Sequence, residues 1–167
     1  MSDLLLYTAS AGFESALQVK ILPAEHRSHR LHGHSFLARV RAQLSAGWGG
    51  GGNPSDALQD QLARCVSTLD YDLLNHHLPV PTDENLTRWI RQHIDVPGIE
   101  LVGIQSTAHE GADLDASEIA HIWRRYRFES AHFLPNVPVG HQCGRMHGHG
   151  FEVILHVRQN LAASDMG

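Results

Sequence analysis

The stretch Phe128-Glu129-Ser130-Ala131-His132, followed by His147-Gly148-His149, decides the fold because the chain contains it twice. The earlier copy is Phe13-Glu14-Ser15-Ala16-Leu17, followed by His32-Gly33-His34. The offset between the copies stays constant, since 128−13 and 147−32 both equal 115 residues. An offset that holds through a loop predicts a duplicated structural unit.

A repeat period of 115 residues divides the chain of 167 unequally. We expect a first unit over 1–118 and the N-terminal hairpin of a second unit over 119–167, truncated to less than half a period. The truncated unit would be completed either by a longer natural protein or by pairing with another chain.

Hydrophobic periodicity predicts an α+β domain, in the order β-β-α-α-β-β followed by β-β. The expected strands are 4–16, 35–44, 100–104, 118–133 and 151–157, and 110–117 is expected to be a loop. One helix is expected from a cap at Ser55 or Asp56 to about Thr68, and a second from Thr82 to about Ile94.

Composition limits the classes of function. The net charge of −5 and pI of about 6.2 argue against a nucleic-acid partner. The chain has no run of 18 apolar residues, and its start lacks the pattern of a secretory signal. Two cysteines in unlike contexts predict no disulfide framework. We therefore expect a cytoplasmic protein without a membrane anchor.

The 14 histidines are unusually many, and three of them suggest a metal site. His147 and His149 are two residues apart at the start of a strand, so both side chains leave the same face. His132 ends the preceding strand of the same hairpin and can meet them across the ladder. Three imidazoles are a suitable ligand set for Zn²⁺ and leave one position open for water or substrate.

Cys143 lies four residues before His147 in a loop rich in glycine and polar residues. A thiol beside a dication and Arg145 is a usable base or nucleophile, whereas a lone cysteine is often only a small buried hydrophobe. Cys65 fits that second description. His141 and His26 are expected to be polar loop residues. The remaining histidines His76, His77, His93, His109 and His121 share no spacing, and we expect them to be structural or surface residues.

These motifs resemble a known family. The segments 128–132 and 143–149 are similar to the opening motif of the 6-pyruvoyl-tetrahydropterin synthase / 6-carboxy-tetrahydropterin synthase family, and the loop Gly140–Arg145 is closest to its bacterial 6-carboxy branch. In the first copy, 69–75 resembles the family segment Leu-Asp-His-x-x-Leu-Asn, and 81–86 resembles the helix start Pro-Thr-x-Glu-Asn-Leu.

The resemblance implies the tunnelling fold, with two helices on one face of an antiparallel sheet, assembled as trimers or hexamers. It implies zinc on His132, His147 and His149, with Cys143 as proton acceptor beside an Asp-His pair of an adjacent subunit. It also implies a lyase that converts 7,8-dihydroneopterin triphosphate to 6-carboxytetrahydropterin, acetaldehyde and triphosphate, in the queuosine pathway. No redox cofactor is implied.

The first copy departs from the family pattern. Leu17 stands at a zinc-ligand position and Ser28 at the cysteine position. Tyr71 replaces the histidine of the Asp-His pair and leaves Asp70 alone. Ser106 stands at the position of the glutamate that anchors the pterin ring. We therefore expect a catalytic second unit beside a degenerate first unit, and no turnover by these 167 residues alone. The alternatives are a 6-pyruvoyl-tetrahydropterin synthase and a non-catalytic zinc-binding protein of the same fold.

Overall fold

A computed structural model of the chain describes residues 4–160. Its strands are β1 (Leu4–Leu17), β2 (His32–Ser45), β3 (Asp72–Leu73), β4 (Ile99–Thr107), β5 (Glu110–Asp115), β6 (Ile119–His132) and β7 (His147–Asn160). They form one seven-stranded sheet in the order β3-β1-β2-β4-β5-β6-β7. Neighbouring strands are antiparallel except β1 and β3, which run parallel.

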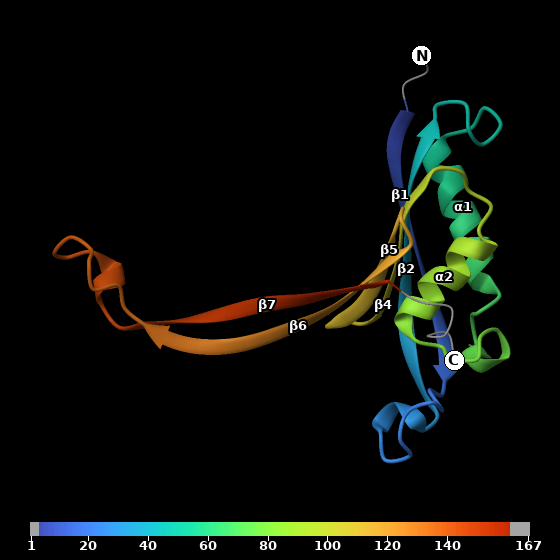
Figure 1. Cartoon of the computed structure of the whole chain (residues 1–167). Coiled ribbons are helices and arrows are strands. Elements are labelled where there is room, and N and C mark those ends of the chain that lie inside the picture. Colours follow the sequence, from blue (N-terminus) through green and yellow to red (C-terminus); the bar gives the residue numbers. More distant parts are fainter. Residues whose placement is uncertain (1–3, 161–167) are drawn as a thin grey trace.

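Two helices cover one face of the first strands, as Figure 1 shows. Helix α1 (Pro54–Ser67) packs on β1 and β2, and α2 (Asp83–His93) packs on β4 and β5. Leu62 of α1, Leu86 of α2 and Val40 of β2 are fully buried in the core between the layers. This arrangement confirms the predicted α+β class with both helices on one face.

The two long hairpins repeat the same local structure. In the first, Leu17 pairs with His32, and in the second His132 pairs with His147. Each connection contains a short 3-10 helix, η1 (Arg27–His29) or η3 (Gln142–Gly144). The Val19 N–H donates to the Ser28 carbonyl at 2.9 Å, and the equivalent bond, Leu134 to Cys143, is 2.8 Å long.

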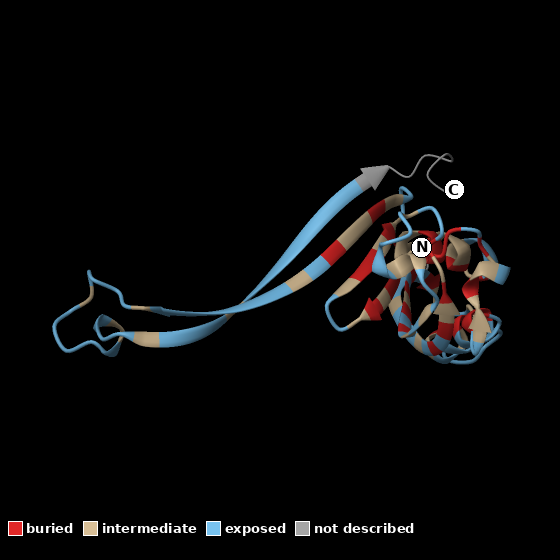
Figure 2. Cartoon of the chain, turned by 90° about the horizontal axis from the view of Figure 1, so that it is seen from below, coloured by how far each residue is buried: buried red, intermediate tan, exposed pale blue. Residues whose placement is uncertain are grey.

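The second hairpin leaves the body of the molecule as an arm. Residues 120–124 of β6 pair with β5, so the sheet continues into the hairpin. Beyond Arg124, β6 pairs with β7 but with no other described strand. Figure 1 shows β6 and β7 extending away from the sheet, and Figure 2 shows that this hairpin is exposed over most of its length.

The structure corrects two local predictions. Residues 110–117 were expected to be a loop, but 110–115 form β5, because this segment pairs with β4 on one side and β6 on the other. Its buried Ala112 and Leu114 alternate with acidic residues. Helix α1 is capped by Asn53, whose Oδ1 accepts from the Ser55 N–H at 3.1 Å, so neither Ser55 nor Asp56 is the cap. None of the helices described is long and apolar enough to cross a bilayer.

Candidate metal centre

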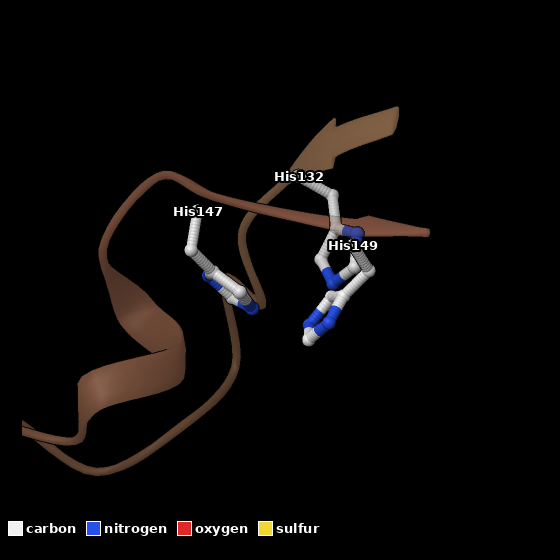
Figure 3. Close-up of side chains that lie close together, drawn as sticks. All are labelled: His132, His147 and His149. Atoms are coloured by element: carbon white, nitrogen blue, oxygen red, sulfur yellow. The ribbon is translucent and has the colours of Figure 1, made fainter. Parts of the chain in front are cut away.

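Three histidines converge at the outer end of the β6–β7 hairpin (Figure 3). His132 ends β6 directly opposite His147 at the start of β7, and His149 follows two residues later on the same face. One ring nitrogen from each residue can be chosen so that all three lie within 4.8 Å of one another. The hairpin register therefore brings together the three histidines that the sequence analysis selected as candidate ligands.

The backbone already orients one of these rings. The Nδ1–H of His147 donates to the Arg145 carbonyl at 2.7 Å, which leaves Nε2 as the nitrogen with a free lone pair. A metal-binding histidine commonly has its second nitrogen fixed in this way, because the hydrogen bond sets both the tautomer and the ring direction. His32 makes the same bond to Arg30 in the first hairpin.

The three imidazoles fit a zinc ion. Nitrogen ligands of a tetrahedral zinc lie about 3.4 Å apart, so the rings need to approach one another only slightly. His132 and His147 are half-buried and His149 is exposed, which leaves one side of the cluster open to solvent. A site with three protein ligands and an open position is typical of catalytic rather than structural zinc.

Cys143 lies in η3, in the connection between β6 and β7, and is partly exposed as a free thiol. Its sulfur is not a member of the histidine cluster in the part of the chain that the structure describes. Its backbone N–H donates to Nδ1 of His141 at 3.1 Å. His141 therefore stabilises the loop by accepting this backbone hydrogen bond, and His26 accepts the equivalent bond from the Ser28 N–H.

Comparison with known proteins matches this hairpin to a family. Residues 121–167 match the family model described as 6-pyruvoyl tetrahydropterin synthase. This segment, less than a third of the chain, is therefore similar to that family. The structure also resembles 6-pyruvoyl tetrahydropterin synthase from Caenorhabditis elegans, with a TM-score of 0.51 at 16% identity over 64% of this chain and 91% of that one. By that likeness, the larger part of the chain has the tunnelling fold.

The residues expected to align with the Asp-His pair of the family are not paired with each other. Asp70 is exposed, and its Oδ1 accepts from the Glu14 N–H at 2.8 Å. The Tyr71 side chain is 85% exposed, and its backbone has a positive φ of 54°. Through this hydrogen bond, Asp70 holds the segment before β3 against β1.

An Asp-His cluster that the sequence analysis missed lies two residues farther on. Asp72 accepts from His76 Nδ1 at 3.0 Å and from His77 Nε2 at 2.9 Å. Hydrogen bonds from the Leu73 N–H, His77 and His76, in that order, lower the pKa of Asp72 to about 2. The four-residue spacing of Asp72 and His76 was a usable signal, although the sequence analysis expected His76 and His77 to be structural or surface residues.

The first hairpin lacks the third imidazole. Leu17 occupies the place that His132 has in the second hairpin, and it is buried in the core. His32 and His34 remain adjacent, with ring centroids 5.3 Å apart. Burial, and secondarily the neighbouring His32, lower the pKa of His34.

A carboxylate that the sequence analysis also missed lies next to Ser106. Ser106 Oγ donates to Asp83 Oδ2 at 2.6 Å, which joins β4 to the first residue of α2. A carboxyl group therefore lies beside Ser106, and burial raises the pKa of Asp83 to about 7. Asp83 is the variable position of the Pro-Thr-x-Glu segment, so the family pattern gave no reason to select it.

Proposed function

We propose that this protein is a zinc-dependent tetrahydropterin synthase, with its reactive centre in the second unit, 119–167, and a supporting first unit, 1–118. His132, His147 and His149 would hold the metal, and the convergence of these rings within 4.8 Å is the observation that carries the proposal. Zinc held there would supply Lewis-acid polarisation of the oxygens on the pterin side chain.

Cys143 is proposed as the proton acceptor. It lies in the connection that joins the metal ligands, it is partly exposed, and its sulfur is outside the ligand cluster. A thiol that does not bind the metal can accept a proton from the substrate. Asp70 is the weaker candidate for the proton relay, since its Oδ1 already accepts a backbone hydrogen bond.

The favoured reaction is that of a 6-carboxytetrahydropterin synthase, from 7,8-dihydroneopterin triphosphate to 6-carboxytetrahydropterin, acetaldehyde and triphosphate. The loop from Gly140 to Arg145 supports this branch by its resemblance to the bacterial enzymes. The 6-pyruvoyl branch remains the alternative, and release of acetaldehyde distinguishes the two.

A homo-oligomer of trimer or hexamer type is part of the proposal. The support is the arm, because the edge of β6 beyond Arg124 has no strand partner other than β7 among the residues described. An open edge favours pairing with another chain.

Zinc analysis tests the metal centre first. The purified chain should contain one zinc per molecule, His147→Ala should lose it, and the matched control His109→Ala should keep it. His109 lies in the turn between β4 and β5, outside the cluster. Equal substoichiometric zinc in all three proteins would contradict the proposal.

Turnover is tested separately with dihydroneopterin triphosphate and acetaldehyde detection. The 167 residues alone are expected to release none, whereas a chain that also carries the remaining elements of a second unit should be active and lose activity on Cys143→Ala. Turnover by the 167 residues that disappears in Asp72→Asn would reject Asp70 and assign the proton relay to the Asp72 cluster. A protein that binds zinc but lacks activity in every form would favour the non-catalytic alternative, to which the exposed Tyr71 already gives support.

A further inference from the structure

The outer edge of β1 changes character at Ser10. Strand β1 pairs with β2 on one side, and on its other side it pairs with β3 at Ser15 and Ala16. Antiparallel pairing turns the backbone groups of every second residue away from the neighbouring strand. Ser10 is one of these residues, since its N–H and C=O both bond to a side chain of α1. By the same alternation, the backbone groups of Leu6 and Thr8 also lie on the outer edge.

From Ser10 onward, side chains take the place of a neighbouring strand. The Gln59 amide accepts from the Ser10 N–H at 3.4 Å and donates to the Ser10 carbonyl at 2.9 Å. The Asn75 amide accepts from the Gln18 N–H at 2.8 Å and donates to the Gln18 carbonyl at 2.9 Å. Between them, the N–H and C=O of Glu14 both bond to the segment that precedes β3. This part of the edge is therefore closed to another strand.

The stretch before Ser10 is open. Among the residues described, no hydrogen bond from this side reaches Leu6 or Thr8. Leu5 is 51% exposed and Leu6 is 53% exposed. Leu4–Ala9 contains neither a charged residue nor proline, which are the residues that commonly protect the edge of a sheet. An apolar edge without this protection is suited to pairing with another strand.

The second hairpin shows this stretch in its paired state. Under the offset of 115 residues, 119–124 of β6 are the equivalents of 4–9 of β1. Residues 120–124 of β6 pair antiparallel with β5, and this pairing ends one residue before Arg125, the equivalent of Ser10. The repeated unit therefore has its pairing edge in the same place twice, and the edge is occupied in the second unit and open in the first.

A second copy of the chain offers one matching strand, which is β1 itself. Its β5 is not available, because β4 and β6 occupy both edges of that strand. The outer edge of β7 carries Glu152, His156 and Arg158, whereas Leu4–Ala9 is uncharged. Two β1 strands place apolar side chains against apolar side chains and leave no charge without a partner.

The two-fold register follows from the position of the open backbone groups. When Leu6 lies opposite Leu6 of the partner subunit, Thr8 lies opposite Leu4 of the partner subunit, and about six backbone hydrogen bonds form. This register ends before Ser10, where Gln59 closes the edge. Directly opposed residues point to the same face of a sheet, so the helices of both copies lie on one face of the enlarged sheet.

We propose that Leu4–Ala9 is a docking edge for a second copy of this chain, joined by antiparallel pairing of the two β1 strands, and that Gln59 ends the interface at Ser10. The interface is isologous, as expected for a two-fold dimer. It is also short, so the association is in the micromolar range rather than tighter. The inference goes beyond the proposed function and does not depend on it, because neither the arm nor the histidine cluster takes part.

Disulfide trapping tests the register in a Cys143→Ser background, which removes the partly exposed native thiol. Leu6→Cys brings two thiols together across the axis, with Cα atoms about 5.5 Å apart, within the range of a disulfide. We expect a covalent dimer on mild oxidation. Thr8→Cys is the matched control on the same edge and face. Its two copies would be about 14 Å apart, so it should give about tenfold less dimer or none.

Sedimentation tests the interface without oxidation, in a Leu155→Ser background that weakens association through the arm. Leu6→Lys should remove the remaining dimer, because like charges meet at the axis. Leu37→Lys is the control, since it adds the same charge to the same face one strand farther in, at a side chain that is 38% exposed. Gln59→Ala should tighten the dimer several-fold, because it frees the Ser10 backbone for further hydrogen bonds.

Three results would overturn the proposal. They are no trapped dimer from Leu6→Cys, equal trapping from Thr8→Cys, and a Leu6→Lys variant that sediments like Leu37→Lys. If Leu6→Lys does not fold, the two trapping variants decide the question. His147→Ala should leave trapping unchanged, so failure of the zinc centre and failure of this interface are separate results.

Discussion

Replacing Asp83 by asparagine is expected to stabilise the protein above neutral pH. The Asp83 carboxyl group is partly buried at the start of α2 and lines a cavity of the first unit, and its pKa rises from 3.8 to about 7. At about 1.4 kcal/mol per pKa unit, the ionised form costs roughly 4 kcal/mol of folding free energy once both states have lost the proton. Water in the adjoining cavity solvates part of the charge, so we expect Asp83→Asn to gain about 2–4 kcal/mol at pH 8.

The size of this stability difference depends on pH. Below about pH 4, Asp83 is protonated in both the folded and the unfolded chain, and the variant and the unaltered protein should be equally stable. Between pH 4 and about 7 the folded chain keeps the proton that the unfolded chain has lost, so the stability of the unaltered protein falls as pH rises. Asp83→Asn lacks this fall, because its amide does not titrate.

Urea unfolding of both proteins at several pH values between about 4 and 8 measures the difference. Asp56→Asn is the control, since it removes an exposed charge from the first turn of α1 and should lose about 0.3–1 kcal/mol of helix-dipole stabilisation. An Asp83→Asn variant that is less stable than the unaltered chain at pH 8, or equally more stable at pH 4 and pH 8, would refute the reasoning.

Three further predictions concern the metal, the core and assembly. The first unit should bind no tight zinc, because His32 and His34 lack a third imidazole, and a second equivalent in metal analysis would contradict this. Leu86→Ala should cost about 2–5 kcal/mol in urea unfolding, since Leu86 is fully buried; a loss under 1 kcal/mol would mean that the helices pack loosely. Sedimentation at micromolar concentration should find an oligomer, and Leu155→Ser should weaken it; a stable monomer would count against sheet pairing between chains.

The sequence predicted those parts of the fold that are encoded locally. Strand β2 alternates clearly and both helices have an apolar stripe, so periodicity predicted them, whereas β1 was predicted from its apolar, β-compatible composition. Segment 110–115 could not be recognised in this way, because it holds glycine and three acidic residues and becomes a strand by pairing on both sides. Tertiary pairing outweighs weak strand propensity there.

The candidate sites also differ in whether local sequence or tertiary packing brings their residues together. The histidine cluster was predictable, because strand register alone brings His132 opposite His147. The hydrogen bond between Asp83 and Ser106 joins residues 23 apart, on a helix and a strand, and only the packing of α2 on the sheet brings them together. Asp72 and its two histidines are local, and the four- and five-residue spacings could have revealed them.

The two hairpins show how much of this fold depends on its helices. Phe13 stacks on Phe36 with ring centroids 5.0 Å apart, and Phe128 stacks on Phe151 with ring centroids 5.2 Å apart. The hairpin sequence therefore produces the same local contact twice. Burial differs sharply, since Phe13 is 3% exposed and Phe128 is 51% exposed.

The same contrast continues along the second strand of each hairpin, where Val40 is fully buried and Leu155 is 54% exposed. In the first unit α1 and α2 cover this face, whereas the described residues provide no helix over the arm. Burying each such side chain contributes about 1.5–3 kcal/mol. The strand register, and with it the position of the three histidines, therefore requires only the hairpin itself. The apolar face of the arm, in contrast, is stabilised mainly by whatever covers it. This is the physical reason to expect assembly.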